Sequence, residues 1–511
     1  MRFSLTTSLL NSLFFSTLSV FQANAQSRPP NIILIIADDL GYSDLSSYGN
    51  KYLQTPNIDG LGVNGVRFTR AYVTAPICAP SRVGIMTGRY QNRFGSEFMP
   101  YPKFDPAFMK QLKKSYMPFH AKTEGEKTMK PHFGIDRSKY HTGLPDDEIT
   151  IAELIRKAGY ATGLVGKWNL GDEDNKFPEQ CGYDYCYFFT GALTRYVDDP
   201  VDTFRYVNQR LPWALSDMAA WQPRAASTAI REGKNIVKDT GYLTFSIAQK
   251  GIEFIDRNKD RPFFLTLTFN APHDPFQVPR SYFDQITTTN DRVKRVYYGM
   301  IEALDDAVGE VLKKIESLGL EQNTMVIFIS DNGGATYTRA TDNAPLSGGK
   351  CTHLEGGLLV PFFIKYPSMI SNPSVYGKSV SSLDIFSTIA AVAKAGLPTD
   401  RRFDGVNLFP FLSNDSSAPH ELLFWRSGYS KAVCKGDWKL YVNEKDGRKY
   451  LFNLIDDIGE KRDLSKTHAD KLNELMKALE QWEKTQTVKP AWPSASDVSI
   501  DVDGEVFHFP T

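Results

Sequence analysis

The chain has 511 residues, of which 41% are hydrophobic and 13% aromatic, so it can bury the core of one large domain and a smaller one. Lysine plus arginine and aspartate plus glutamate each number 59, which gives a formal net charge of zero. This balance excludes an overall basic field that would hold nucleic acid or an anionic membrane surface, so any recognition of an anion must be local.

The N-terminal 25 residues have the composition of a secretory signal peptide. Arg2 supplies the positive charge, residues 5–20 form an apolar run, and Ala23-Asn24-Ala25 offers small residues for cleavage. We therefore expect residues 1–25 to be removed and the protein to be exported, to the periplasm or outside the cell. A retained membrane anchor is the alternative, but Ser, Thr and Asn interrupt the run, which falls short of a clean span of ~20 apolar residues.

The first predicted strand ends in two carboxylates. Residues 31–37 form a continuous apolar run rich in isoleucine, which is typical of a strand covered on both faces, and Asp38 and Asp39 follow directly. Further along lies a spaced motif, Cys78-Ala-Pro-Ser-Arg82 followed by Thr87-Gly88-Arg89. A buried thiol in a turn is the plain alternative for such a cysteine, but a match at every fixed position of this motif is rare by chance.

Helical and strand-like segments alternate through the middle of the chain. Residues 151–158 and 293–318 have apolar side chains at helical spacing, and residues 161–165 read as a strand. This alternation predicts an α/β fold in which a mainly parallel central sheet is flanked by helices. We expect it to form one catalytic domain, residues 26–420.

Two further predicted strands also end in polar side chains. The apolar run 263–269 leads to His273, and the run 325–330 leads to Asp331 and Asn332. The carboxyl ends of parallel strands share one edge of a sheet, and ligands of open α/β sheets bind there. We therefore expect these side chains to meet the carboxylates that follow the first strand.

Oxygen atoms dominate this set of strand-end side chains. Asp38, Asp39, Asp331 and Asn332 suit a hard divalent cation and suit zinc poorly, because zinc prefers nitrogen and sulfur ligands. Calcium is the first expectation and magnesium the weaker one. Taken alone, Asp-Asp could cap a helix and Asp-Asn-Gly could form a turn.

Two stretches, residues 93–147 and 190–240, resist a periodic assignment and are rich in aromatic and charged side chains. They have the character of insertions near the site, where rings and cations could clamp an anionic sugar, although packing and solvated charge explain most residues of this kind. The candidates are Tyr101, Phe104, Tyr116, Phe119, His120, Arg195, Tyr196, Arg205, Tyr206, Arg210 and Trp213.

The pattern changes after about residue 420. Short strand candidates at 422–425, 438–442 and 449–453 are separated by turns with Gly and Asp, and a helix follows at 466–485. These segments predict a small C-terminal subdomain, residues 421–511, with an antiparallel sheet, a helix and an irregular tail.

Export would place the five cysteines in an oxidising compartment. Besides Cys78, the chain contains Cys181, Cys186, Cys351 and Cys434, which can pair in three ways or remain free thiols. Their spacing does not decide between these alternatives.

The motif that begins at Cys78 resembles the signature of the formylglycine-dependent sulfatases, C-x-P-S-R-x-x-x-x-T-G-R. The wider resemblance extends from about Pro29 to Leu464, nearly the whole predicted mature chain. It includes the dispersed segments Ala271-Pro272-His273, Ser330-Asp331-Asn332-Gly333, Gly348-Gly349-Lys350 and Gly436-Asp437-Trp438-Lys439-Leu440. The resemblance implies an alkaline phosphatase-like fold and hydrolysis of sulfate esters.

The same resemblance implies a role for each residue of the site. A maturation enzyme would oxidise Cys78 to formylglycine, whose hydrate attacks sulfur. Arg82, Lys167 and Lys350 would neutralise the sulfate, and His273 would protonate the leaving alcohol. The implied metal ligands are Asp38, Asp39, Cys78, Asp331 and Asn332, and the implied substrate-binding residues are Lys167, Asn169, His273 and Lys350.

One departure from the family pattern lies at residues 166–171, Gly-Lys-Trp-Asn-Leu-Gly, where the family usually has histidine at the position of Asn169. An amide can donate a hydrogen bond but cannot take up a proton at neutral pH, so the base for sulfate release is unassigned. His120, His132 and His141 in the first insertion could substitute, and nothing in the spacing favours one.

The resemblance and the signal peptide together predict an exported sulfatase that acts on a sulfated carbohydrate or polysaccharide. Its expected partner is a formylglycine-generating maturation enzyme, with neither nucleic acid nor stable membrane insertion. Two alternatives remain open. One is a phosphonate or phosphodiester hydrolase with the same nucleophile and fold, and the other is a catalytically impaired protein that binds sulfated glycans, which Asn169 would explain.

Overall fold

The computed structural model describes residues 28–101, 128–132, 135–136, 139–198, 201–213, 221, 223–413 and 417–511. The predicted signal peptide, residues 1–25, lies outside the described residues. Four of the aromatic or histidine candidates also lie outside them, namely Phe104, Tyr116, Phe119 and His120.

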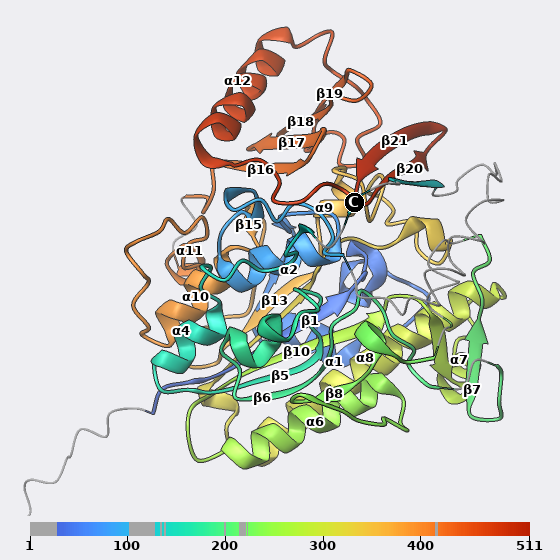
Figure 1. Ribbon diagram of the computed structural model, residues 1–511, viewed down its shortest axis with the longest axis vertical. Coiled ribbons are helices and arrows are strands. Elements are labelled where there is room, and N and C mark those ends of the chain that lie inside the picture. Colours follow the sequence, from blue (N-terminus) through green and yellow to red (C-terminus); the bar gives the residue numbers. More distant parts are fainter. Residues whose placement is uncertain are drawn as a thin grey trace, which may run out of the picture.

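A large mixed sheet forms the centre of the molecule (Figure 1). Within the described ranges it has ten strands in the order β14-β2-β13-β12-β1-β10-β5-β6-β8-β9. The run of parallel strands at its centre comprises β12 (Thr324–Ser330), β1 (Asn31–Asp38), β10 (Phe263–Pro272), β5 (Ala161–Lys167) and β6 (Tyr185–Phe189). The predicted α/β fold with a mainly parallel sheet is confirmed.

The outer strands of this sheet are shorter and mostly antiparallel to their neighbours. They are β13 (Phe362–Lys365), β2 (Val66–Phe68), β14 (Ser374–Tyr376), β8 (Arg231–Glu232) and β9 (Asn235–Ile236). Two small pairs lie apart from it, β3 (Ala71–Tyr72) with β15 (Val380–Ser381) and β7 (Tyr206–Gln209) with β11 (Phe276–Pro279).

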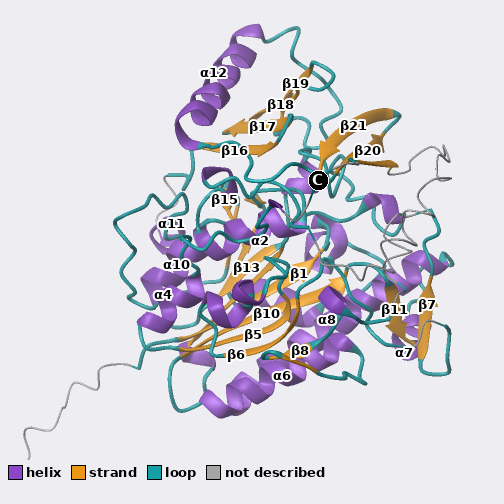
Figure 2. Cartoon of the chain, viewed as in Figure 1, coloured by secondary structure: helices purple, strands orange, loops and turns teal. Residues whose placement is uncertain are grey.

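Helices cover both faces of the sheet (Figure 2). One face packs against α1 (Pro56–Val63), α6 (Leu243–Asn258), α7 (Arg280–Gln285) and α8 (Arg292–Ser317). The other packs against α2 (Cys78–Thr87), α4 (Ile151–Lys157), α10 (Asp384–Val392) and α11 (Phe409–Ser413). The strands between them bury both faces, which is why their sequences are continuous apolar runs instead of alternating ones.

Local sequence accounts for the longest of these helices. Helix α8 begins after Asp291, whose side chain accepts hydrogen bonds from the backbone N–H groups of Val293 and Lys294. Its buried residues Val296, Met300 and Leu304 recur at four-residue spacing and pack on the sheet. The helix predicted at 293–318 is therefore confirmed, with its boundaries displaced by one residue at each end.

Strand register brings the polar side chains together at one edge. Ala37 of β1 lies beside Ser330 of β12, and Asp38 lies beside Pro272 of β10. On the far side of β10, Gly166 of β5 lies beside Thr268. The residues that follow these positions therefore project from the same carboxyl end of the sheet.

A smaller sheet with one helix across it follows in the chain and lies at the top of Figure 1. Its antiparallel strands are β16 (Leu422–Ser427), β17 (Ser430–Lys435), β18 (Trp438–Asn443) and β19 (Arg448–Asn453), and the helix is α12 (Ala469–Gln486). The predicted small antiparallel sheet is confirmed. Strand β17 was not predicted, because its short run Ser430–Lys435 contains two lysines and has a polar pattern.

The prediction of an irregular tail is wrong. Residues 496–510 form a hairpin of β20 (Ser496–Val502) and β21 (Glu505–Pro510), and β20 also pairs with β4 (Thr128–Pro131). The turn residues Asp503 and Gly504 have φ of 56° and 84°. Asp-Gly between alternating apolar residues favours a tight hairpin turn because both positions must take positive φ, so the local signal was present.

Two further features of the described residues concern the cysteines and the length of the apolar helices. All five cysteines are buried, and none of them forms a disulfide bond within the described residues, so the structure has thiols and not bridges. Within the same ranges, no helix has both the length and the apolar character that a membrane crossing requires.

Candidate active site

Strand β1 delivers two carboxylates to the edge of the sheet. Asp38 is its last residue and is fully buried, and Asp39 follows with φ of 61°, a left-handed conformation that aspartate tolerates better than most side chains. The backbone N–H of Asp39 donates to Oδ1 of Asp331 at 3.2 Å. This turn separates the two adjacent side chains, so that each meets a different set of partners.

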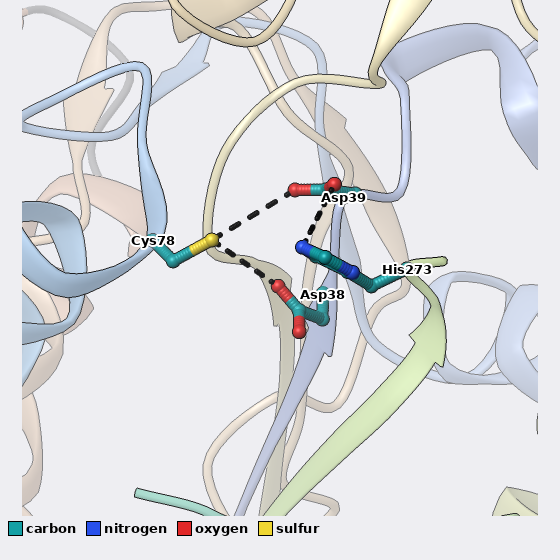
Figure 3. A group of neighbouring side chains, drawn as sticks. All are labelled: Asp38, Asp39, Cys78 and His273. Carbon is teal, nitrogen blue, oxygen red and sulfur yellow. Dashed lines mark hydrogen bonds and ion pairs between the residues drawn. The ribbon is translucent and has the colours of Figure 1, made fainter. Parts of the chain in front are cut away.

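Cys78 lies opposite these carboxylates at the first turn of helix α2. Its Sγ is 3.5 Å from Oδ1 of Asp38 and 4.0 Å from Oδ1 of Asp39 (Figure 3). The residue is 1% exposed. Helix N-termini favour negative charge, so the start of α2 is suited to a group that carries or attracts an anion.

Three buried cations neutralise the carboxylates. Nζ of Lys167 is 2.6 Å from Oδ2 of Asp38, and Nζ of Lys350 is 2.8 Å from each carboxylate oxygen of Asp39. The third cation, Arg82, donates from Nε to Oδ2 of Asp331 at 2.7 Å. Positive charge is thus gathered where an anionic substrate would need it.

A glycine allows Lys167 to reach this position. Gly166 has φ of 120°, and a Cβ there would lie 1.9 Å from the carbonyl oxygen of Thr268. Only glycine permits so close an approach of β5 to β10 in this backbone conformation. The residue after it, Lys167, is completely buried against Asp38.

The cations also control the ionisation of Asp38. Burial alone would raise the pKa of this carboxyl, but Lys167, His273 and Arg82 outweigh it and hold the pKa well below its usual range. Asp38 is therefore an anion at all physiological pH values.

His273 projects from the turn after β10 with its two ring nitrogens in different surroundings. Nδ1 lies 2.6 Å from the carbonyl oxygen of Asp274 and 3.0 Å from its Oδ1, and Nε2 lies 3.6 Å from Oδ2 of Asp39. Burial and Lys350 disfavour the imidazolium, but the surrounding carboxylates, Asp39 first, outweigh them and raise the pKa of His273 well above its usual value. A protonated His273 is suited to donate a proton.

The acidic group has the chemistry of a site for a hard cation. Ligand atoms of Asp38, Asp39, Cys78 and His273 lie within 4.8 Å of one another, all buried. Oδ1 of Asn332 is also buried and has no hydrogen-bond partner, while its Nδ2 donates to Oδ1 of Asp39 at 2.8 Å. The oxygen atoms of this set fit calcium or magnesium, whereas a protonated His273 has no lone pair at Nε2 for a metal.

The structure thus brings together nine of the ten sequence-predicted site residues through direct contacts. The tenth, Asn169, lies two residues after Lys167 with φ of 58° and is 3% exposed, and its Oδ1 is buried without a hydrogen-bond partner. Its candidate substitutes His132 and His141 have partners elsewhere. His132 contacts Ser494 and Asp497 of the C-terminal segment, and His141 contacts Glu173.

Sequence reasoning missed two residues that contact His273. Asp274 follows His273 directly in the sequence, and this adjacency is the only local signal for its contact with the imidazole. The sequence predicts stacking on a sugar for Tyr196, but the residue is 0% exposed and its hydroxyl contacts the backbone of the His273 turn. No local signal connects residue 196 with residue 273.

Comparison with known proteins identifies the family. The family model described as Sulfatase matches residues 30–395, which are most of the chain and include all ten predicted site residues. The chain belongs to the sulfatase family. It is a sulfuric ester hydrolase, as the named sulfatases among its relatives also indicate.

Two curated relatives illustrate the range of substrates in this family. The steryl-sulfatase of Mus musculus is 29% identical over 548 residues, which cover 90% of this sulfatase and 82% of the relative. The N-acetylgalactosamine-6-sulfatase of Mus musculus is 28% identical over 438 residues, with 84% and 75% covered.

Solved structures share the fold of this sulfatase. The crystal structure of Ps i-CgsB in complex with k-i-k-neocarrahexaose has a TM-score of 0.75 and 30% identity, and the match covers 91% of this chain and 95% of the other. The phosphonate monoester hydrolase of Agrobacterium radiobacter has a TM-score of 0.61 and 17% identity, with 89% and 96% covered. At that identity the second likeness concerns the fold alone.

Proposed function

We propose that this sulfatase hydrolyses sulfate esters on a carbohydrate or polysaccharide through a formylglycine derived from Cys78. The observation that carries the proposal is the position of Cys78, which lies within the complete sulfatase motif and faces Asp38 and Asp39 among three buried cations. Its Sγ stands where the hydrated aldehyde carbon would carry its two hydroxyl oxygens.

In the first proposed step one hydroxyl of the residue-78 diol attacks the sulfur of the substrate. A carboxylate, Asp39 or Asp331, takes the proton of this hydroxyl, a new S–O bond forms, and the S–O bond to the substrate alcohol breaks. His273 gives a proton to the departing oxygen, and it can do so because nearby carboxylates keep its imidazole protonated. Lys167, Lys350 and Arg82 stabilise the negative charge.

In the second step the sulfated diol collapses. Its remaining hydroxyl gives its proton to His273, which the first step left neutral and whose ring nitrogen lies within 4.8 Å of the Cys78 sulfur. The C–O bond to sulfate then breaks, sulfate leaves, and the aldehyde forms again and takes up water. Asn169 cannot accept that proton. Asp38, Asp39, Asp331 and Asn332 would hold a calcium ion, with magnesium as the weaker choice, and this ion would supply further positive charge to the sulfate.

Several observations support a carbohydrate substrate and export. The structural neighbour Ps i-CgsB is described in complex with an oligosaccharide, and one curated relative is a sulfatase of N-acetylgalactosamine. The N-terminal segment has the composition of a signal peptide, which would bring the enzyme to the polysaccharide outside the cytoplasm.

Mass spectrometry of the tryptic peptide that carries residue 78, from protein made in its native host, tests the nucleophile. We expect the mass of formylglycine or its hydrate. Unmodified cysteine in an active preparation would exclude the proposed chemistry.

A substrate panel tests the reaction class. Turnover is compared for a sulfated oligosaccharide, a steryl sulfate, an aryl sulfate and a phosphate diester under the same conditions. We expect the highest kcat/KM with the oligosaccharide. Preference for the diester would favour the phosphonate or phosphodiester hydrolase, and binding of sulfated glycan without any release of sulfate would favour the impaired binding protein.

A further inference from the structure

We propose that Tyr196 is a positioning residue for His273 and thereby controls protonation of the leaving group. This inference rests on the proposed function, in which His273 is the acid. The hydroxyl of Tyr196 lies 2.6 Å from the carbonyl oxygen of Asn270 and 2.8 Å from that of His273. The residue is completely buried.

The Tyr196 hydroxyl bridges the two ends of the turn that carries the acid. Within this turn the backbone N–H of His273 donates to the carbonyl oxygen of Asn270 at 2.9 Å. The phenol therefore contacts one carbonyl near the end of β10, that of Asn270, and one just after the strand, that of His273. Beyond the turn, the imidazole has only Asp274 and Asp39 as its ring-nitrogen partners among the contacts that the described residues make.

Tyr196 is itself held rigidly from its own side. Its ring stacks on that of Tyr242 with centroids 5.4 Å apart and an interplanar angle of 22°. Its backbone N–H donates to Oε1 of Gln277 at 2.8 Å, and its carbonyl accepts from the N–H of Leu243 at 2.9 Å. A phenol fixed in this way can set the position of a backbone turn instead of following it.

The chemistry of the hydroxyl suits this role. Burial raises the pKa of Tyr196 well above its usual value, as do Tyr242 and the nearby carboxylates, so the phenol keeps its proton and remains a donor. Loss of that single proton, which the two buried carbonyl oxygens share, would weaken their hydrogen bonding and loosen the turn. A small displacement of a catalytic group lowers the rate steeply, because proton transfer requires hydrogen-bond distance.

The dependence of the rate on the leaving group distinguishes positioning of the acid from a general structural role. Protonation matters most for alcohols that leave poorly, so Tyr196→Phe should slow turnover of an alkyl sulfate or a sulfate of an unsubstituted phenol by about 10- to 100-fold. Turnover of 4-nitrophenyl sulfate, whose phenolate leaves readily, should change by less than about 3-fold. The substitution keeps the stacked ring, so we expect little change in Tm.

Tyr242→Phe provides the matched control. Tyr242 is buried in the same aromatic stack, but its hydroxyl donates to the carbonyl oxygen of Gln277 at 3.0 Å and not to the His273 turn. We expect this variant to keep the wild-type dependence on the leaving group. An equal loss across the substrate series in Tyr196→Phe, or no loss at all, would overturn the inference.

His273→Gln separates failure of this inference from failure of the proposed function. In this variant the rate should depend on the leaving group as it does in Tyr196→Phe, but more steeply. If it does and Tyr196→Phe does not, the acid is correct and the positioning role is wrong. If His273→Gln loses activity equally with every leaving group, His273 is not the acid and the inference falls with that role.

Discussion

The molecule contains two buried clusters of charge that look alike by composition and differ in what they can do. The strand-end cluster gathers seven charged side chains around Cys78, the proposed nucleophile, namely Asp38, Asp39, Asp331, Arg82, Lys167, Lys350 and the protonated His273. The interface cluster lies between the main sheet region and the small C-terminal sheet and consists of Lys439, Glu355, Glu460 and Tyr72.

In the interface cluster the groups bind one another. Nζ of Lys439 lies 2.8 Å from Glu355 and 3.0 Å from Glu460, and Glu460 also accepts the backbone N–H of Glu355 at 2.6 Å. The hydroxyl of Tyr72 donates to Oε2 of Glu355 at 2.9 Å. These contacts join strand β18 to helix α9 (Glu355–Leu358), so we assign the cluster to stability.

The strand-end cluster differs because its groups converge on a reactive position. It contains the thiol of Cys78 and the unpaired Oδ1 of Asn332, and its carboxylates and cations surround them. Buried histidines show the same contrast, since the pKa of His273 is raised beside carboxylates and that of His353 is lowered by burial and by Lys439. Burial and shifted pKa values occur in both clusters, so convergence on a nucleophile is the better indicator of catalysis.

The largest expected effect is loss of the nucleophile from the strand-end cluster. Cys78→Ala should lower kcat/KM for an aryl sulfate by at least about 10⁴-fold, because no other group in the cluster can form the proposed covalent bond. Cys186→Ala, at a buried thiol outside the cluster, is the matched control and should keep most activity. Comparable activity in the two variants would contradict the assignment of Cys78.

The next effect concerns the interface cluster and should appear in stability. Lys439→Met leaves two carboxylates buried without their cation, so the free energy of unfolding should fall by about 3–5 kcal/mol in urea titrations. The exposed Lys449 on the neighbouring strand provides the control Lys449→Met, which should change it by less than about 0.5 kcal/mol. If the folded Lys439→Met protein lost as much activity as Cys78→Ala does, the assignment of different roles to the two clusters would be wrong.

Removal of the metal should act on the strand-end cluster alone. Dialysis against a chelator should lower activity by about 100-fold or more, and calcium should restore it, because the sulfate would lose part of its positive surroundings. Comparing the unfolding of Cys78→Ala with and without calcium measures binding of the metal without any need for turnover. Full activity after verified removal of divalent cations would exclude the proposed metal.

The smallest expected effect is a dependence of stability on pH from His353, a buried histidine influenced by Lys439 of the interface cluster. Burial, aided by Lys439, lowers the pKa of His353 to about 3 in the folded protein, whereas the unfolded chain takes up the proton near pH 6.5. Folding therefore excludes a proton, and this residue should remove about 2 kcal/mol of stability between pH 7 and pH 5. In His353→Gln the fall over this range should be smaller by that amount, and an unchanged fall would show that other groups are responsible.

Much of the fold and site could be predicted because the relevant signals are local. The apolar run of β1 specifies a strand buried on both faces, and the alternation of such runs with helices implies that their carboxyl ends meet. The motif at Cys78 and the dispersed segments around His273 and Lys350 indicate the family without any structure. The C-terminal hairpin also has a local signal in the sequence, the Asp503-Gly504 turn, although the hairpin was not predicted.

The amino-acid sequence by itself therefore determined the fold class and the family, and it predicted which side chains meet at the edge of the sheet. Tertiary structure alone decided which partners these residues have: that Tyr196 bridges the His273 turn, that Lys439 meets Glu355, and that the last strands pack their Val498 and Phe509 beside Ile77. Such contacts join positions tens to hundreds of residues apart. They depend on how whole elements pack, and no periodicity or short motif records that arrangement.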